Sequence, residues 1–325
     1  MNRTQEEYEM KVVILEPLAV EKDRLMAIAQ EILGDSVEIT MYDNRTLDPQ
    51  ELSERGKDAD IVIEANQPLS AEVIKGFKNC KLLNVGFTGL DHVALDACKE
   101  MGMMVCNCSG YSTACVADLV FGSLISFYRN IAACDTATRN GGTMAGLVGY
   151  ELEGKKFGVV GTGAIGLRVA KIAAAFGCEV YAYSRTVKDV PGVTYVSLDE
   201  LMSTCDIISL HMPSNASTKG MISAEKIAMM KENAVLINMA RGPVIDSQAL
   251  ADALNNDKIL GACIDVYEME PPIPGDHPLL TAKHTVVTPH VAFATKEAFI
   301  KRAYILFENI KAYMNGTPQN VKVEA

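Results

Sequence analysis

The chain contains 325 residues, of which 49% are hydrophobic, and its formal net charge is -11. This length predicts two domains, and the negative charge without a local basic patch excludes nucleic acid as a partner. No apolar run approaches the roughly 20 residues that span a bilayer, and the polar start MNRTQEEYEM does not resemble a secretion signal, so we expect a cytoplasmic protein with no membrane partner.

The cysteines do not form a recognisable framework. There are nine, and Cys106 and Cys108 have a C-x-C spacing that is not typical of a zinc site and is not completed by a second pair. We therefore expect free thiols in a reducing compartment, mostly as small core residues, and no metal site.

Apolar runs alternate with amphipathic stretches in the first hundred residues. Strand patterns occupy residues 11–17, 60–65, 81–87 and 102–107, and helical patterns occupy residues 20–33 and 70–77. This βαβ alternation predicts a parallel sheet covered by helices.

A long helical pattern over residues 112–140 and a glycine-rich stretch over residues 141–156 separate this series from a second one. The second series consists of runs rich in Val and Ile, as expected of strands buried on both faces. These runs occupy residues 156–161, 179–184, 206–211, 234–239, 260–265 and 285–290, and a final helical pattern covers residues 296–315.

The sequence VVGTGAIG places Gly161, Gly163 and Gly166 between a strand and a helix. In a dinucleotide-binding turn the first glycine allows the tight turn, the second lets the backbone approach the pyrophosphate, and the third lets helix and strand pack closely. The amides at the helix start favour an anionic ligand. We expect a dinucleotide site, and a purely structural glycine turn is the alternative.

Ser184 and Arg185 stand where such units place an Asp or Glu for the ribose of NAD. An acid there would repel a 2′-phosphate, whereas a hydroxyl and a guanidinium can bind one. This favours NADP as the preferred cofactor, with NAD possible. The alternative is a solvent-facing arginine beside a permissive NAD site.

Three later segments follow strands with polar side chains. INMARGPVID carries Arg241, CIDVYEMEPP carries Asp265, Glu268 and Glu270, and TPHVAFAT carries His290. Ligands of open α/β sheets bind beyond the carboxyl ends of the strands, so we expect these residues to share one crevice. Taken singly, each could be a surface arginine, a solvated acid or a capping histidine. Similar structural interpretations hold for the other histidines: His92, His211, His277 and His284.

Together these residues fit the reduction of a 2-keto acid. Arg binds a carboxylate through a bidentate fork, His donates a proton near neutral pH, and a neighbouring carboxylate favours imidazolium and orients the ring.

The motifs, in this order from NVGFTGLDHV to TPHVAFAT, resemble those of the D-isomer-specific 2-hydroxyacid dehydrogenases, which include glyoxylate/hydroxypyruvate reductases, D-lactate dehydrogenases and 3-phosphoglycerate dehydrogenases. The resemblance implies two Rossmann-like α/β domains with parallel sheets, one flavodoxin-like and one NAD(P)-binding. The cofactor domain, residues 112–289, would be inserted into a substrate domain of residues 1–111 and 290–325. The chain would be too short for the regulatory domain of many phosphoglycerate dehydrogenases.

The resemblance also implies residue roles. Arg241 would orient the substrate, His290 would be the acid/base, and Glu270 would be its partner, which leaves Glu268 a bystander. Substrate-binding residues would be Phe87, Thr88, Gly89, Arg241 and His290. Cofactor-binding residues would be Thr88, Gly161, Gly163, Ala164, Ile165, Gly166, Ser184, Arg185, Met212, Pro213, Met239 and Asp265.

Within that cofactor set the resemblance implies separate positions along the dinucleotide. Ala164 and Ile165 would meet the pyrophosphate. Met212 and Pro213 would cover the adenine side. Met239 would lie near the nicotinamide, and Asp265 would bind its carboxamide.

The stretch CVADLVFGSLI resembles the family's long interdomain helix, which commonly builds a homodimer. The resemblance also implies that Phe293 borders the substrate pocket, at a position where many members carry Gly or Trp. The leading hypothesis is an NADP-preferring oxidoreductase that reduces glyoxylate, hydroxypyruvate or a pyruvate-like acid to a D-2-hydroxy acid. The alternatives are an NAD-dependent phosphoglycerate dehydrogenase, with Arg45 and Arg55 as candidate phosphate ligands, and a dinucleotide-sensing binding protein.

Overall fold

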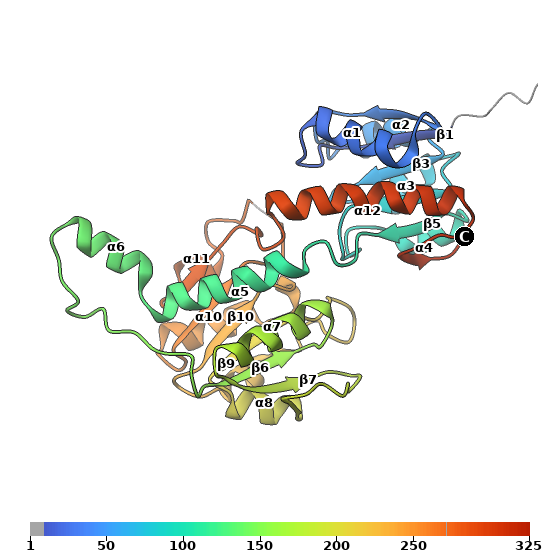
Figure 1. Cartoon of the computed structure of the whole chain (residues 1–325). Coiled ribbons are helices and arrows are strands. Elements are labelled where there is room, and N and C mark those ends of the chain that lie inside the picture. Colours follow the sequence, from blue (N-terminus) through green and yellow to red (C-terminus); the bar gives the residue numbers. More distant parts are fainter. Residues whose placement is uncertain (1–9, 271) are drawn as a thin grey trace, which may run out of the picture. The chain divides into compact units, whose positions relative to one another are not determined.

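The computed structural model describes residues 10–270 and 272–325. They form two compact units, one of residues 10–111 and 295–325 (unit 1) and one of residues 112–294 (unit 2). Each unit is a mainly parallel sheet covered by helices (Figure 1), which confirms the expected α/β class. Residues 1–9, which contain most of the polar start of the chain, lie outside the described residues.

Unit 1 contains a six-stranded sheet in the order β13-β5-β4-β3-β1-β2. All neighbours are parallel except β13, which pairs antiparallel with β5. The order of the five parallel strands, 2-1-3-4-5, is that of flavodoxin-like folds. The strands are β1 (Met10–Ile14), β2 (Val37–Met41), β3 (Ile61–Glu64), β4 (Leu82–Val85), β5 (Met104–Asn107) and β13 (Val321–Val323); the helices are α1 (Lys22–Leu33), α2 (Pro49–Gly56), α3 (Ala71–Gly76), α4 (Leu95–Glu100) and α12 (Lys296–Met314).

Unit 2 contains a seven-stranded, all-parallel sheet in the order β12-β11-β10-β9-β6-β7-β8. The strand order reverses between β6 and β9, which is where doubly wound sheets bind ligands. The strands are β6 (Lys156–Val160), β7 (Glu179–Tyr183), β8 (Val193–Tyr195), β9 (Ile207–Leu210), β10 (Val235–Asn238), β11 (Gly261–Ile264) and β12 (Thr285–Val287); the helices are α5 (Thr113–Tyr128), α6 (Ile131–Arg139), α7 (Ala164–Ala175), α8 (Leu198–Thr204), α9 (Ala224–Ala228), α10 (Ser247–Asn255) and α11 (Pro278–Thr281), with a 3-10 turn η1 (Gly242–Val244).

The helical pattern over residues 112–140 is not one helix, as the sequence suggested, but two. Asn130 adopts a left-handed conformation with φ of 51°, which ends α5 and starts α6 at a bend of 53°. Asn tolerates this conformation better than most residues. No single helix within the described ranges is long and apolar enough to cross a membrane, although α5 and α6 together have the length and composition of a bent span.

The second crossing of the chain between units lies at Thr295, five residues beyond the boundary expected at His290. The reason is a set of hydrogen bonds that hold the intervening turn in unit 2. The amides of His290, Val291 and Ala292 all donate to Asp265, which follows β11.

The cysteines are free thiols, as expected, and all except Cys134 are buried. Burial raises the pKa of Cys80 to about 12 and of Cys263 to about 12. A thiol that stays protonated is a poor nucleophile, so these side chains serve as small core residues.

Candidate active site

The sequence-predicted residues of unit 2 follow strands at one edge of its sheet. The glycine turn follows β6, Ser184 follows β7, Met212 follows β9, Met239 and Arg241 follow β10, Asp265 follows β11 and His290 follows β12. All seven strands of this sheet are parallel. Their carboxyl ends therefore meet at the same edge, where open α/β sheets bind ligands.

The glycine turn has the conformation that a dinucleotide site requires. Gly161 has a φ of 101°, and a Cβ on it would lie 2.6 Å from the carbonyl oxygen of His211. A Cβ on Gly166 would lie 1.9 Å from the carbonyl oxygen of Gly161. The turn therefore admits only glycine at both positions, because β6, β9 and α7 approach one another closely there.

Gly163 differs from the other two glycines because nothing lies within 4 Å of the position of its missing Cβ. It is the N-cap of α7, and no side chain caps the helix there. The amides of Ala164 and Ile165 therefore begin a helix with no side-chain acceptor at its N-cap, beside open space. This arrangement fits a pyrophosphate, which an uncapped helix N-terminus binds through amides and dipole.

The end of β7 carries more positive charge than the sequence motif indicated. Ser184 is partly exposed and Arg185 is exposed, and among the described residues Arg185 makes no ion pair. Lys188, which we did not predict, donates from Nζ to the carbonyl oxygen of Thr162 at 2.7 Å. The hydroxyl of Thr162 is buried without a hydrogen-bond partner. Two cationic side chains therefore follow β7, in the segment where an acidic side chain would favour NAD.

The residues expected around adenine and nicotinamide lie in the segments that follow β9 and β10, and packing and a hydrogen bond hold these segments in place. Met212 and Met239 are buried in the two cores of unit 2. The carbonyl of Pro213 accepts a hydrogen bond from the hydroxyl of Thr218 at 2.6 Å. The burial of the two methionines and this hydrogen bond therefore hold the backbone after β9 and β10 in place.

Arg241 lies in an extended conformation just before η1. Its Nη1 donates to the carbonyl of Ala240 at 2.7 Å, and its own carbonyl accepts from the side chain of Asn238 at 2.9 Å. The next residue, Gly242, has no room for a Cβ, which would lie 1.8 Å from the carbonyl carbon of Tyr267. This close approach brings the arginine segment against the segment that carries Glu268 and Glu270.

Asp265 is fully buried, and its carboxylate organises the turn at the end of β12. One oxygen accepts from the hydroxyl of Thr288 at 2.6 Å and the amide of Val291 at 2.8 Å, and the other accepts from the amide of Ala292 at 2.8 Å. The sequence assigned this residue a cofactor contact only. Three of about four acceptor positions of the carboxylate are therefore used within the protein.

His290 and Glu270 form a close pair. Nδ1 of His290 lies 2.6 Å from Oε2 of Glu270. The histidine backbone has a φ of 56°, a conformation that is uncommon outside glycine and is concentrated at functional sites. Phe293 packs edge-on against the imidazole, with ring centroids 5.2 Å apart. The ring is therefore oriented by both the carboxylate and the phenyl ring.

Glu268, expected to be a bystander, has a structural role. Its Oε2 lies 2.8 Å from Nε2 of His277, whose ring packs edge-on against Tyr267. Partial burial opposes ionisation of Glu268, but hydrogen bonds from His277 and Ser247 outweigh it and lower its pKa. This hydrogen-bonded pair fastens the segment that carries Glu270.

The remaining histidines do not share the environment of His290. Burial lowers the pKa of His211 to about 3, so its ring is neutral and hydrogen-bonded to Ser209 at 2.9 Å. His284 is exposed and lies 3.1 Å from a carboxylate oxygen of Asp257. His92 belongs to unit 1, where it pairs with buried Glu64.

The loop expected to bind the substrate carboxylate follows β4 in unit 1. Phe87 is buried, whereas Thr88 is exposed and Gly89 is partly exposed. The carbonyl of Thr88 accepts from the side chain of Asn107 at 2.7 Å, and its hydroxyl donates to the carbonyl of Cys108 at 3.3 Å. The neighbouring strand end thus holds the loop in shape.

The two arginines considered as phosphate ligands are engaged within the protein. Arg55 is buried. It donates to the carbonyls of Leu15 and Asn44 at 2.8 Å. Arg45 donates to the carbonyl of Asn66 at 3.1 Å.

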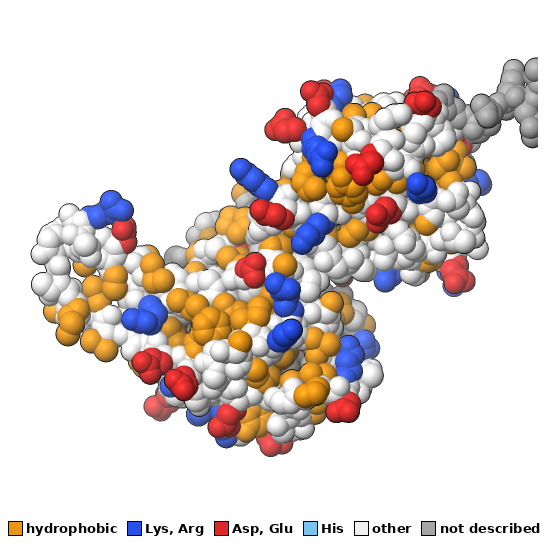
Figure 2. Space-filling model, viewed as in Figure 1, with side chains coloured by type: hydrophobic (Ala, Val, Ile, Leu, Met, Phe, Trp, Pro, Cys, Tyr) orange, Lys and Arg blue, Asp and Glu red, His pale blue; other side chains and the backbone are white. Residues whose placement is uncertain are grey.

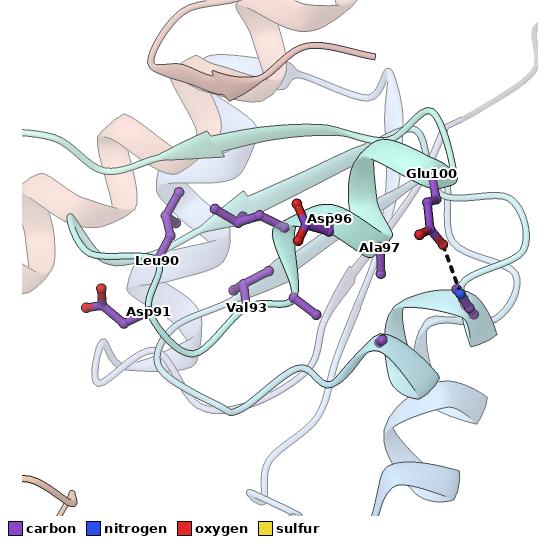
Figure 3. A pocket seen from close by; sticks show the side chains of 10 residues that line it. Leu90, Asp91, Val93, Asp96, Ala97 and Glu100 are labelled. Carbon is purple, nitrogen blue, oxygen red and sulfur yellow. Dashed lines mark ion pairs between the residues drawn. The ribbon is translucent and has the colours of Figure 1, made fainter. Parts of the chain in front are cut away.

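A cavity of about 650 Å³ is lined by residues of α3, of α4 and of the segment before α4 (Figure 3). Leu90, Asp91 and Asp96 line it, as do Lys75 and Glu100, which form an ion pair of 2.9 Å. None of the predicted catalytic residues lines this cavity. The volume of a cavity therefore does not by itself identify the active site of this protein.

Comparison with known proteins identifies the family of the chain. The family described as "D-isomer specific 2-hydroxyacid dehydrogenase, NAD binding domain" matches residues 121–292. A hydroxypyruvate reductase of Blautia hydrogenotrophica is 34% identical over 96% of this chain and 99% of its own length. A D-3-phosphoglycerate dehydrogenase of Methanocaldococcus jannaschii is also 34% identical, but the match covers 58% of that protein.

Among solved structures, an acyclic imino acid reductase in complex with NADPH and D-Arg is similar with a TM-score of 0.89. It is 31% identical, and the match covers 97% of this chain and 100% of that one. The similarity extends over both units and includes the domain that binds the nicotinamide cofactor. The chain belongs to the D-isomer specific 2-hydroxyacid dehydrogenases, oxidoreductases that act on CH–OH donors.

Proposed function

We propose that the protein is an NADP-preferring reductase that converts a small 2-keto acid, such as glyoxylate, hydroxypyruvate or a pyruvate-like acid, to a D-2-hydroxy acid. The observation that carries this proposal is the 2.6 Å pair of His290 and Glu270. It lies at the same edge of the sheet of unit 2 as Arg241 and the glycine turn. The reductases of hydroxypyruvate and glyoxylate among its relatives support the same substrate class.

The chemistry divides between cofactor and protein. The bound nicotinamide supplies the hydride to the keto carbon. His290 donates a proton to the carbonyl oxygen as it becomes an alkoxide, and Glu270 stabilises and orients the imidazolium before that transfer. Arg241 binds the carboxylate or polarises the carbonyl through its guanidinium. Acid–base help of this kind contributes about 10²–10⁴ in rate.

The proposed preference for NADP rests on the positively charged side chains that follow β7. A 2′-phosphate would meet Ser184, Arg185 and Lys188, and no acid stands in this segment between residues 183 and 188. Charge-assisted hydrogen bonds from such cations are about twice as strong as neutral ones. The NADPH bound in the similar imino acid reductase supports this choice.

We propose that the amides near Thr88 and Gly89 bind the substrate carboxylate, that Phe87 shapes the pocket, and that Phe293 limits substrate size beside His290. A phosphorylated substrate is less well supported. The arginines that might bind its phosphate, Arg45 and Arg55, are engaged with backbone carbonyls and with glutamates.

We also propose a homodimer that uses α6 and the segment after it. No residue of α6 is buried, and the helix extends away from the sheet of unit 2 (Figure 1). Figure 2 shows hydrophobic side chains along this projecting part. Met144 and Val148 are 79% and 77% exposed. Light scattering of the purified chain tests this assignment, and a monomer at all concentrations contradicts it.

Steady-state kinetics with NADPH and NADH against a panel of 2-keto acids tests the enzyme assignment. The panel includes each keto acid with ammonium, because the similar imino acid reductase is named for an imine substrate. We expect turnover of at least one keto acid without ammonium, and a higher kcat/KM with NADPH. His290→Ala and Arg241→Ala should lose turnover while their circular dichroism remains that of the wild type.

Two outcomes contradict the proposal. Activity in either variant close to that of the wild type would remove these residues from catalysis. Cofactor binding with no turnover on the whole panel would favour the dinucleotide-sensing alternative.

A further inference from the structure

The loop that carries Phe87, Thr88 and Gly89 is anchored by a second histidine–carboxylate pair. Nε2 of His92 lies 2.8 Å from Oε1 of Glu64, the last residue of β3. The glutamate is fully buried, whereas the imidazole side chain is 18% exposed. The ring also packs edge-on against Phe87 at 6.4 Å, so the pair lies directly behind the loop.

The two groups of this pair affect each other's ionisation. Burial is the largest influence and raises the pKa of Glu64 above its usual range, although the charge and hydrogen bond of His92 oppose that shift. A buried carboxylate is costly unless it is paired and hydrogen-bonded. Here it has both His92 and the amide of Gln67, at 3.1 Å. The carboxylate in turn favours the imidazolium form of His92.

Other charges around the pair nearly cancel. Glu16 is 3% exposed and lies 3.6 Å from Nε of Arg45. Arg302, 2% exposed, has Nη1 3.5 Å from the carbonyl oxygen of Gly86 and its guanidinium 6.0 Å from the ring of Phe87. Two arginines thus balance the two buried glutamates.

Protonation of His92 therefore raises the charge of the cluster by one unit. The two arginines offset the two glutamates, and Asp91 in the loop adds one negative charge, which an imidazolium would offset. Burial raises the pKa of Cys108, which stays neutral. The titratable and charged groups on the elements around the pair are Glu16 after β1, Arg45 after β2, Glu64 in β3, Asp91 in the loop, Cys108 and Tyr111 after β5, and Arg302 in α12.

We propose that His92 is a positioning residue for the substrate: its imidazolium form supplies a positive charge behind the loop that binds the carboxylate of the 2-keto acid. The proposal rests on the proposed function, since it assigns the carboxylate to this loop. Loss of that charge weakens binding of the anion without removing the proton donor, His290. Substrate affinity should accordingly fall as pH rises through the titration of His92, independently of the step at His290.

The test is binding of oxalate, a 2-keto acid analogue, to the intact chain with NADP⁺, measured by calorimetry at about pH 6 and pH 8, on either side of the ordinary imidazole pKa. His92→Gln should weaken oxalate binding at the lower pH about 5- to 20-fold, the effect of one partly screened nearby charge. NADP⁺ affinity should not change. Because His290 is a second imidazole, both forms are compared again in a His290→Gln background, where the effect of His92→Gln should persist.

A second variant and a direct readout keep the proposal testable if His92→Gln does not fold. Glu64→Gln should move the loss of oxalate affinity to lower pH, because it removes the carboxylate that favours imidazolium. The ¹⁵N chemical shifts of the His92 ring in the wild type report its protonation. His284→Asn, which removes an exposed histidine paired with Asp257, is the matched control and should bind oxalate as the wild type does.

A neutral His92 ring at about pH 6, or unchanged oxalate affinity in His92→Gln, overturns the proposal. Wild-type protein that binds oxalate with this pH dependence but reduces no 2-keto acid contradicts the proposed function instead. The two failures are thus distinguishable.

Discussion

Asp265 holds His290 in place through the backbone: the amide of His290 donates to the carbonyl of Asp265 at 2.8 Å, and the Asp265 carboxylate accepts from the amides of the next two residues. Three contacts converge on one buried residue at the end of β11. A histidine with a φ of 56° is retained because the surrounding hydrogen bonds over-determine its conformation.

Asp265→Asn should therefore destabilise the protein and impair turnover together. The amide group replaces an acceptor oxygen with a donor that faces an N–H or O–H donor. We expect a loss of about 2–4 kcal/mol in the free energy of unfolding, measured by urea denaturation, and a reduced kcat. Asp257→Asn, at an exposed acid, should stay within about 0.5 kcal/mol of the wild type. Equal stability of the two variants would contradict the anchoring role.

Glu270→Gln and Glu268→Gln separate the two acids of the EME segment. Glu270 pairs with His290, so its amide variant should lower kcat about 10- to 100-fold at unchanged NADPH affinity. Glu268 pairs with His277, so its variant should lower the free energy of unfolding by about 1–3 kcal/mol and keep kcat within a few-fold. Stopped-flow and denaturation measurements check both. If Glu268→Gln lowered kcat and Glu270→Gln lowered only the stability, the roles assigned to the two glutamates would be wrong.

Two glycines of the cofactor turn should respond oppositely to the same substitution. Gly166→Ala places a methyl group 1.9 Å from a carbonyl oxygen, which forces the backbone apart and should cost about 2–4 kcal/mol in stability. Gly163→Ala meets nothing within 4 Å and should unfold like the wild type. It should nevertheless weaken NADPH binding at least about 10-fold, because the methyl group occupies the space of the pyrophosphate. Undiminished NADPH affinity in Gly163→Ala would contradict the site.

Arg185→Ala tests the choice of cofactor. Loss of a charge-assisted contact to the 2′-phosphate should raise the KM for NADPH about 10- to 100-fold, with the KM for NADH changed only a few-fold. Lys188→Ala should act in the same direction but less strongly, since its Nζ already donates to Thr162. Equal changes in the KM for NADPH and for NADH would indicate that Arg185 is a surface residue that does not select the cofactor.

His211 should make stability depend on pH. Its folded-state pKa is about 3 because of burial, whereas an unfolded histidine has a pKa of about 6.5. Between these values the unfolded chain binds one more proton, so stability falls as pH decreases from about 6.5 toward 3, by up to about 1.4 kcal/mol per pH unit. His211→Gln should reduce this slope in urea denaturation at several pH values. An unchanged slope would show that another group is responsible.

Edge strands were the main part of the fold that sequence patterns did not predict. β2 alternates partly exposed and exposed residues, and β8 and β13 have three residues each. None has a continuous apolar run, because an edge strand is not covered on both faces. The helix break at Asn130 was also missed, since a single left-handed residue leaves the apolar pattern on either side intact.

Local patterns of the chain were sufficient for the parallel sheets, the glycine turn and the strand ends that carry Arg241, Asp265 and His290. Those features depend on hydrophobic periodicity and on glycine at fixed spacing, which neighbouring residues specify. Tertiary structure decided which histidine has which partner. Four of the five histidines lie within 3.1 Å of a carboxylate oxygen, and those carboxylates come from segments 9 to 28 residues away. Partner choice, burial of Glu64 and the engagement of Arg55 arise from contacts between distant segments, which no local pattern encodes.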